Sequence, residues 1–324
     1  MSTIIFWGAI FIISLFVLIK ASDFFTDAAE AIGLFLKLPS FIIGVTIVAL
    51  GTSLPELTSS ILAVSEGYPE IVSGNVVGSN ITNIFLILGV VSFVTTRNIL
   101  KHNILRVDLP ILLGSTFLIG VSMIDGEFSF WEGVLCLVGL LVFFYHSKSS
   151  ERGGKKGEQE LSKDVKEETG LKFIKRFPYK SLGILIVSSV FIFVGAKYTV
   201  DSVVEISSLL KVGTEIIAAT VVALGTSLPE LAVSYSAARK GNLEIALGNI
   251  LGSNIFNALA VMGITSMVGT LIIPESVLYF GLPVMIIATF MYVFITQDKE
   301  LTKWEGSFLL IFYVFYIGKL FGLI

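Results

Sequence analysis

Apolar stretches of about twenty residues follow one another along the whole chain, separated by short polar turns. A stretch of that length can cross the ~30 Å hydrocarbon layer of a membrane as a helix. The pattern predicts about ten spans, which we number in chain order. They cover residues 3–22, 39–64, 70–95, 106–124, 130–147, 180–201, 213–238, 243–268, 277–296 and 304–323.

One hydrophilic segment interrupts this pattern between the fifth and sixth spans. Residues 148–180 hold 10 basic and 6 acidic side chains among 33, so this segment cannot lie in lipid. The chain is therefore predicted to have three parts: an N-terminal five-helix half (1–147), a hydrophilic loop (148–180) and a C-terminal five-helix half (181–324).

The two halves repeat each other in sequence. The segment "ALGTSLPEL" occurs at Ala49–Leu57 and again, letter for letter, at Ala223–Leu231. A shift of 174 residues aligns Gly51–Ala63 with Gly225–Ala237 and Gly74–Gly89 with Gly248–Gly263, with 17 identities over 29 positions. A weaker echo pairs the Trp-Glu-Gly that starts at Trp131 with the one at Trp304.

Because each repeat contains an odd number of spans, the second must enter the membrane from the side opposite to the first. This inverted arrangement is typical of secondary transporters, whose site lies near the membrane midplane between the repeats. Lys and Arg cluster on the side of the 148–180 loop, which the positive-inside rule assigns to the cytoplasm. We therefore expect a multi-pass protein of the cell membrane with both termini extracellular.

Composition fits an all-α integral membrane protein. Apolar residues make up 54% of the chain and charged residues only 15%, with a mean hydropathy of +0.90. The stretches are too long and too uniformly apolar for the strands of a β-barrel. The single cysteine, Cys136, excludes an intrachain disulfide and a multi-cysteine metal site.

The first repeated motif combines a helix breaker with a carboxylate. Pro55 lacks a backbone N–H, and Gly51 tolerates unusual backbone angles, so span two is expected to be discontinuous near here. An opened turn in a membrane is tolerated only where its carbonyls line a cavity or bind an ion. Span seven contains the same combination of glycine and proline around Pro229, so it is expected to be discontinuous as well.

Glu56 and Glu230, one in each copy, are the strongest functional candidates. A charged side chain at the bilayer centre costs about 2.5–3.5 kcal/mol on insertion scales, so it needs a partner. No Lys, Arg or His lies in the middle of a repeated motif. The partner must be a bound cation, a proton or a hydrogen-bond network. One divalent ion would offset both charges, as would two protons or two sodium ions.

The second motif, "GNVVGSNITN" and its copy, adds amide and hydroxyl oxygens on neighbouring helix turns. The pooled set contains oxygen but neither sulfur nor imidazole, which suits Ca²⁺ or Na⁺ and argues against zinc or copper. The asparagines Asn75 and Asn249 can equally serve to cross-link helices. The acidic residues Asp23, Asp27, Asp201 and Glu205 are expected at helix ends in water.

These motifs resemble those of the sodium/calcium exchangers of the cation/calcium exchanger superfamily, prokaryotic type. The resemblance extends over both halves and the intervening loop, and it implies two inverted α-repeats with two outer helices, here spans one and six, that slide across a central core. It also implies a metal-binding set that maps onto the motifs residue by residue. That set is Ala49, Thr52, Ser53, Glu56, Ser79 and Asn83 in the first repeat, and Ala223, Thr226, Ser227, Glu230, Ser253 and Asn257 in the second.

Asn257 departs from part of that family. Some microbial exchangers and the potassium-dependent branch carry Asp at this position, whereas potassium-independent animal exchangers carry the neutral amide found here. The amide weakens the case for potassium co-transport and for a proton-binding role at this corner of the site.

We therefore expect a secondary Na⁺/Ca²⁺ antiporter that works by alternating access, with the sodium gradient driving Ca²⁺ export. The expected partners are Ca²⁺, Na⁺ and the lipid bilayer, without nucleic acid or cofactor, and the protein is expected to be a monomer. A Ca²⁺/H⁺ antiporter that uses the same glutamate pair is the nearest alternative, followed by potassium-dependent exchange. A cation channel fits less well because channel filters lie on an axis along the membrane normal. An intramembrane enzyme is disfavoured because no His, Cys or serine dyad accompanies the carboxylates.

Overall fold

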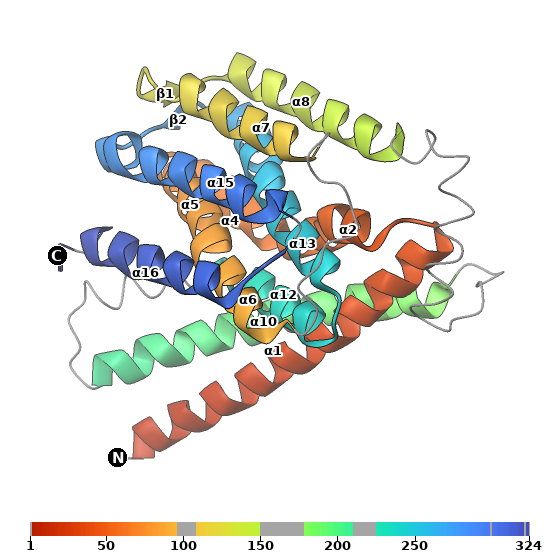
Figure 1. The fold of residues 1–324 in the computed structure, drawn as a ribbon. Coiled ribbons are helices and arrows are strands. Elements are labelled where there is room, and N and C mark those ends of the chain that lie inside the picture. The colour runs from red at the N-terminus through yellow and green to blue at the C-terminus, as the bar shows by residue number, and fades with distance from the viewer. Residues whose placement is uncertain are drawn as a thin grey trace.

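The computed structural model describes residues 2–95, 108–149, 178–209, 225–298, 300–320 and 322–323, and these form a helical bundle (Figure 1). The elements of the first half are α1 (Ser2–Phe35), α2 (Ser40–Ile43), η1 (Gly44–Val48), α3 (Ala49–Thr52), α4 (Leu54–Ser65), α5 (Glu70–Thr82), η2 (Asn83–Leu88), α6 (Gly89–Val94), α7 (Asp108–Ser122), β1 (Glu127–Phe128) and α8 (Phe130–Ser149). Those of the second half are α10 (Tyr179–Leu209), α12 (Leu228–Arg239), α13 (Leu243–Phe256), η3 (Asn257–Val261), α14 (Met262–Val268), β2 (Leu271–Ile272), η4 (Val277–Gly281), α15 (Leu282–Gln297) and α16 (Lys303–Leu320). The elements η1 to η4 are π-helical turns within longer helices.

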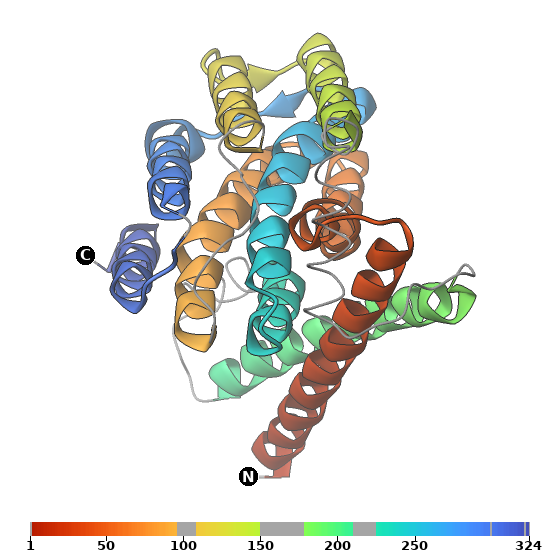
Figure 2. The ribbon, with the colours of Figure 1, turned by 45° about the vertical axis from the view of Figure 1, so that its right-hand side comes forward.

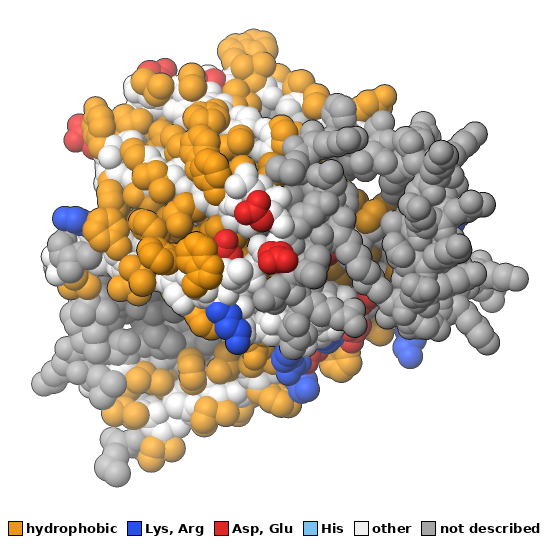
Figure 3. Space-filling model, in the orientation of Figure 1, with side chains coloured by type: hydrophobic (Ala, Val, Ile, Leu, Met, Phe, Trp, Pro, Cys, Tyr) orange, Lys and Arg blue, Asp and Glu red, His pale blue; other side chains and the backbone are white. Residues whose placement is uncertain are grey.

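The helices are built to lie in a membrane. Within the described residues, six helical stretches are long and apolar enough to cross one: Thr3–Phe35, Ser40–Ser65, Glu70–Val94, Tyr179–Ser202, Leu243–Val268 and Val277–Gln297. Hydrophobic side chains also cover much of the outer surface, which lipid rather than water would contact (Figure 3). The prediction of an all-helical membrane protein is confirmed, apart from a ribbon of two short strands.

The two halves run in opposite directions. In Figure 1, α1 leaves the N-terminus at the left and ends at the right, whereas α10 begins at the right and ends at the left. The C-terminus lies on the same side as the N-terminus, while α8 ends and α10 begins on the opposite side. We call these two sides the terminal side and the loop side.

Helix α13, with its continuation through α14, forms the centre of the bundle (Figure 2). The most apolar 18 residues of Leu243–Val268 are all buried, compared with 78% of those of Glu70–Val94. This helix carries the polar side chains Asn249, Ser253 and Asn254, which in a membrane are stable only when they face the protein interior. Helices α1 and α10 pack against each other along one side of this core, away from α7 and α8.

Glycines let the second and eighth spans cross in direct backbone contact. A Cβ on Gly248 would overlap the carbonyl oxygen of Phe41 and come within 2.9 Å of the Val45 amide nitrogen. The contact is mutual, because a Cβ on Gly44 would overlap the carbonyl oxygen of Ile245. Only glycine fits both sides of this crossing, which brings the broken helix of the first repeat against α13.

The Trp-Glu-Gly echo marks two equivalent helix starts. Glu132 accepts hydrogen bonds from the backbone N–H (2.6 Å) and hydroxyl (2.8 Å) of Ser129 at the start of α8. Glu305 accepts the same pair from Thr302 at the start of α16, with the backbone N–H at 2.8 Å. This reciprocal cap satisfies amide groups that the first helical turn leaves unpaired. The echo is therefore structural.

A short antiparallel ribbon, absent from the sequence prediction, ties the two halves together. Glu127 pairs with Ile272 and Phe128 with Leu271, so β1 and β2 join the α7–α8 turn to the turn after α14. Two-residue strands carry no alternating pattern long enough to be recognised in a sequence.

Two sequence expectations need correction. Helices α1 and α10 extend to Phe35 and Leu209, well beyond the predicted ends at 22 and 201. Asp23 and Asp27 therefore lie within a continuous helix rather than at its end, and the same holds for Asp201 and Glu205 in α10. Asp27 and Glu205 are exposed. Of the predicted seventh span, residues 213–224 lie outside the described part of the chain.

The glycine crossing can be tested by adding volume. Gly248→Val should lower the free energy of unfolding by about 1–3 kcal/mol or more, the usual cost of overpacking, because backbone cannot move aside as a side chain can. Thermal unfolding in detergent, followed by intrinsic fluorescence, measures the change. Gly8→Ala is the matched control, since nothing lies within 4 Å of its new Cβ. Equal melting temperatures for the two variants would contradict the direct crossing.

Candidate functional site

In both copies of the first motif a new helix begins directly after the same serine. Ser53 has φ −90° and ψ 4°, and Ser227 has φ −93° and ψ 1°, and each is followed by a new helix with proline at its second position. The break follows from the missing N–H of proline and its clash with the preceding turn. It leaves Glu56 and Glu230 in the first turns of α4 and α12, where the helix dipole favours negative charge.

The second motif ends in a π-helical turn in both repeats. Helix α5 passes into η2 at Asn83, and α13 passes into η3 at Asn257. Such turns are frequent at functional sites.

The contacts between the motifs occur in pairs that the internal repeat relates to each other. The Thr52 hydroxyl lies 3.5 Å from that of Ser253, and the Ser79 hydroxyl lies 3.1 Å from that of Thr226. A shift of 174 residues converts the first pair into the second. Each first motif therefore faces the second motif of the opposite repeat, and the two halves form one site.

Four asparagines form a second set of reciprocal contacts. The side-chain amide nitrogen of Asn83 donates to the side-chain oxygen of Asn254 at 3.0 Å, and that of Asn257 donates to the side-chain oxygen of Asn80 at 3.2 Å. The same shift relates these two bonds. All four side chains are buried, with at most 2% of each exposed.

The two glutamates lie at the centre of these contacts. Glu56 is 1% exposed and Glu230 is 0% exposed, and the two carboxyl groups interact electrostatically. Ser53 donates a hydrogen bond of 3.1 Å to Glu230. The equivalent bond from Ser227 to Glu56 is not formed, since the Ser227 hydroxyl and both Glu56 oxygens lack partners among the described residues.

Unpaired buried oxygens concentrate here. Within the described part of the chain, seven buried side-chain polar atoms have no hydrogen-bond partner, and six of them are oxygens of predicted ligands. They are both oxygens of Glu56, one of Glu230, the amide oxygens of Asn83 and Asn257, and the hydroxyl of Ser227. Native proteins pair nearly all buried polar atoms, so such a concentration favours a shared partner such as a bound cation or protons.

The chemistry of this set suits a hard cation. No group of three or more His, Cys, Asp or Glu side chains occurs within the described residues. A cation here would therefore complete its shell with amide, hydroxyl and carbonyl oxygens. Ca²⁺ accepts 6–8 such ligands in flexible geometry.

The structure places most predicted site residues together. Besides the atoms above, Thr52, Ser53, Ser79 and Ser253 are buried in the same cluster and Thr226 is half-buried. The Ala49 carbonyl, expected as a cation ligand, already accepts two hydrogen bonds. They come from the Ser53 amide at 3.0 Å and the Thr52 hydroxyl at 3.4 Å. Ala223 lies outside the described residues.

Sequence reasoning missed Asn80 and Asn254. Both belong to the "GSN" tripeptide that is identical in the two repeats, so the signal was present in the motif itself. Asn249 links neighbouring helices and also contacts a predicted ligand. It donates to Ser234 at 2.9 Å and accepts from Thr52 at 3.1 Å, whereas its counterpart Asn75 donates to Ser60 at 3.2 Å.

Comparisons with known proteins agree with this geometry. The family described as sodium/calcium exchanger protein matches residues 6–148 and 180–321. The chain is 34% identical to the sodium/calcium exchanger MaX1 of Methanosarcina acetivorans, over 96% of this chain and 97% of that protein. It is 30% identical to the inner membrane protein YrbG of Escherichia coli, over 80% and 79%. A solved structure of the sodium-calcium exchanger NCX_Mj, soaked with Na⁺ and Sr²⁺, superposes with a TM-score of 0.80 at 29% identity, covering 97% of this chain and 98% of that one.

The unpaired carboxylate predicts a conflict between stability and ion binding. Glu56→Gln removes a buried charge without a counter-charge, so the cation-free protein should melt at a higher temperature than wild type. In return, the stabilisation by Ca²⁺ or Sr²⁺, about 2.7 kcal/mol at a concentration of 100 Kd, should be lost. Scanning fluorimetry in cation-free and cation-containing buffer measures both effects. Glu70→Gln, at the exposed start of α5, is the control; an equal cation-induced shift in Glu56→Gln would rule out the site.

Proposed function

The chain belongs to the sodium/calcium exchanger protein family, and from that premise we propose that it is a secondary Na⁺/Ca²⁺ antiporter. Members of this family are membrane transporters, not enzymes. The observation that carries the proposal is the group of six buried, unpaired oxygens contributed by both repeats. We assign their neutralisation to the transported cations.

In this mechanism Ca²⁺ binds between the two glutamates. Glu56 comes from the first repeat and Glu230 from the second, so their charges together balance one divalent ion. The amide oxygens of Asn83 and Asn257 occupy the remaining two corners. After Ca²⁺ leaves, sodium ions take the same carboxylates together with flanking oxygens from two groups. These groups are Ala49, Thr52, Ser53 and Ser79, and Ala223, Thr226, Ser227 and Ser253.

Shared ligands make the exchange obligatory. Since each carboxylate serves both ions, Ca²⁺ and a full complement of Na⁺ exclude each other. The cation-free site, with its unpaired buried charges, costs too much to be carried across freely. An inward Na⁺ gradient therefore drives Ca²⁺ outward when α1 and α10 move across the core and change the side from which the site is reached.

The placement in the membrane follows the charge distribution. We assign the protein to the cell membrane with both termini outside and the 148–180 loop in the cytoplasm, because Lys and Arg gather on the loop side. The division into halves 1–147 and 181–324 joined by this loop is part of the same proposal.

A Ca²⁺/H⁺ antiporter is the second candidate, because protons could neutralise the same glutamates. The hydroxyl pairs Thr52–Ser253 and Ser79–Thr226 favour Na⁺, since protonated carboxylates would not need further oxygen ligands. The amide at Asn257 likewise offers no proton site.

Flux measurements on purified protein in proteoliposomes distinguish the candidates. Vesicles loaded with Na⁺ and diluted into Na⁺-free medium should take up ⁴⁵Ca²⁺ at least tenfold faster than vesicles with equal Na⁺ on both sides. Neither a K⁺ gradient nor a pH gradient should replace Na⁺. Glu230→Gln should abolish the uptake, whereas Glu70→Gln should retain it. Uptake driven by the pH gradient alone would instead establish Ca²⁺/H⁺ exchange.

A further inference from the structure

Asn80 is held in a fixed orientation by a backbone group. Its side-chain nitrogen donates to the backbone carbonyl of Asn254 at 3.2 Å, and a carbonyl can only accept. Nitrogen and oxygen of the Asn80 amide therefore cannot exchange places. Its oxygen faces the side-chain nitrogen of Asn257, from which it receives a bond of 3.2 Å.

This bond decides which end of Asn257 faces the glutamates. With its nitrogen engaged by Asn80, Asn257 turns its oxygen away from that bond, and this oxygen is one of the six buried unpaired atoms. Asn254 accepts a bond of 3.0 Å from the Asn83 nitrogen, which leaves the Asn83 oxygen unpaired, but the Asn254 nitrogen has no partner among the described residues, so only Asn80 is anchored by a backbone group. A reversed amide would present N–H groups, which repel a cation.

We propose that Asn80 and Asn254 are positioning residues that turn the amide oxygens of Asn257 and Asn83 toward the transported cation. Neither residue supplies a predicted ligand, and each acts across the interface on the opposite repeat. The assignment rests on the proposed function only in requiring that a cation binds at this site.

The test is a binding measurement with Sr²⁺ in sodium-free buffer, by calorimetry on the detergent-solubilised protein. Asn80→Leu should weaken Sr²⁺ binding about tenfold, because the freed Asn257 amide samples the reversed orientation. Asn75→Leu is the control: this asparagine lies on the same helix and bonds Ser60 but does not contact Asn257. It should change the affinity less than about twofold. Asn254→Leu removes the equivalent bond to Asn83 and should also weaken Sr²⁺ binding.

A double-mutant cycle separates orientation from general damage. A carboxylate presents oxygen in either orientation, so in the Asn257→Asp background Asn80→Leu should cost less than about twofold. The same loss in both backgrounds, or a wild-type affinity for Asn80→Leu, would overturn the positioning role. A wild-type protein that bound no Sr²⁺ would overturn the proposed function as well.

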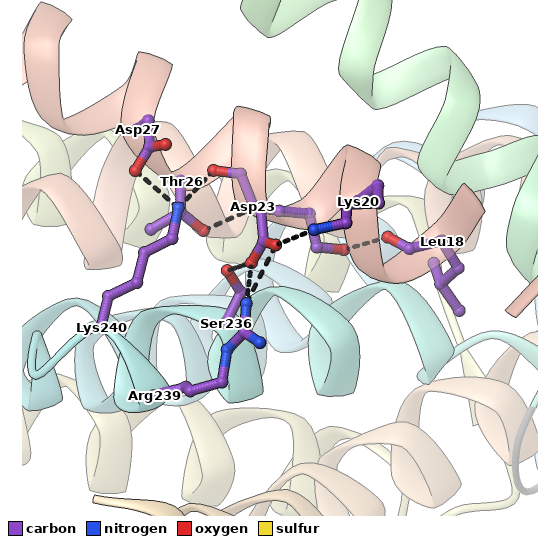
Figure 4. Close-up of polar contacts among 9 residues, drawn as sticks. Leu18, Lys20, Asp23, Thr26, Asp27, Ser236, Arg239 and Lys240 are labelled. Carbon is purple, nitrogen blue, oxygen red and sulfur yellow. Dashed lines mark hydrogen bonds and ion pairs between the residues drawn. The ribbon is translucent and has the colours of Figure 1, made fainter. Parts of the chain in front are cut away.

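A separate polar cluster joins α1 to the end of α12 on the loop side (Figure 4). Arg239 donates to both carboxylate oxygens of Asp23 at 2.9 Å, and Ser236 donates to one of them at 2.7 Å. Lys240 bonds the Asp23 carbonyl and the Asp27 carboxylate, each at 2.6 Å. Both bonds from Arg239 come from one guanidinium nitrogen, Nη2, so the stabilising feature is the network of several charges rather than a fork-like pair.

On the terminal side, the equivalent helices α10 and α4 are not joined by such a cluster among the described residues. Helix α1 packs along α12, whereas among the described residues α10 makes no comparable packing with α4. The shift of 174 still relates the two places, since α12 and α4 are followed by glycines with matching positive φ, 83° at Gly241 and 87° at Gly67. Among the described residues, α1 is thus joined to α12, whereas α10 is not joined to α4.

The charges at the separated position are reversed at two of the related residues. The counterpart of Asp23 on α10 is Lys197, and the counterpart of Lys240 after α4 is Glu66. Both side chains are exposed in this structure. The counterpart of Asp27 is Asp201, which stays acidic. Docking of α10 on α4 would therefore pair Lys197 with Glu66, without an arginine and with Asp201 repelling Glu66.

We propose that the Asp23–Arg239–Lys240 cluster is a latch that holds α1 on α12 and keeps the site closed toward the loop side. Lys197 and Glu66 form the weaker latch of the opposite state. The difference between the two latches favours the loop-closed state at rest. This inference uses the alternating access of the proposed function but not the identity of the ions.

Spin labels report the closure directly. Leu36→Cys and Gln297→Cys place labels at exposed positions at the ends of α1 and α15, in a Cys136→Ser background that removes the only native cysteine. Pulsed dipolar spectroscopy on the cation-free protein should show one dominant distance. Arg239→Gln should increase a second population about fivefold, as expected for loss of the bridging ion pair.

Lys20→Gln is the matched control. Lys20 lies 3.9 Å from the same carboxylate of Asp23, but on the same helix, so its loss removes a charge beside Asp23 without breaking an ion pair between α1 and α12. The swap Asp23→Arg with Arg239→Asp should restore the single distance, and Asp23→Asn should behave like Arg239→Gln. If Arg239→Gln and Asp23→Asn both match Lys20→Gln, the cluster is ordinary packing and the latch is refuted.

Discussion

The structure depends on one constraint: two carboxylates are buried in an apolar bundle without a basic side chain beside them. Glu56 and Glu230 come from opposite repeats, and among the described residues three of their four carboxylate oxygens have no hydrogen-bond partner. A lone buried polar network of this kind would destabilise the fold. It is tolerable if a cation supplies the missing interaction for most of the transport cycle. The helix breaks, the π-helical turns and the glycine crossing all serve to bring these oxygens together.

Much of this site could be predicted from the sequence because the inverted repeat restricts where its two motifs can meet. Two copies of a motif with Pro and Glu, separated by an odd number of spans, can meet only at a shared central site. The burial of Glu56 and Glu230 and the contacts Thr52–Ser253 and Ser79–Thr226 follow that expectation. The length of α1 could not be predicted in the same way, since Asp23 and Asp27 read as a polar end until their partners Arg239 and Lys240 are seen in space.

Other features depend on side-chain direction, which periodicity leaves open. The role of Asn80 depends on a carbonyl of the opposite repeat, and the role of Gly248 depends on where a second helix crosses it. A symmetric sequence also says nothing about which of two related contacts is formed. Here Ser53 bonds Glu230, whereas the Ser227 hydroxyl has no partner among the described residues. Likewise α1 packs on α12, whereas the described parts of α10 and α4 make no comparable contact. The two related positions therefore differ within this one structure.

The central claim is that sodium and calcium compete for the same buried oxygens. Equilibrium binding of ⁴⁵Ca²⁺ to the detergent-solubilised protein, measured over a range of Na⁺ concentrations at fixed pH, tests it most directly. The account predicts that Na⁺ displaces Ca²⁺ completely, and that the apparent Kd for Ca²⁺ rises more steeply than in proportion to the Na⁺ concentration. A Ca²⁺ affinity that did not respond to Na⁺ but fell with rising acidity would contradict it.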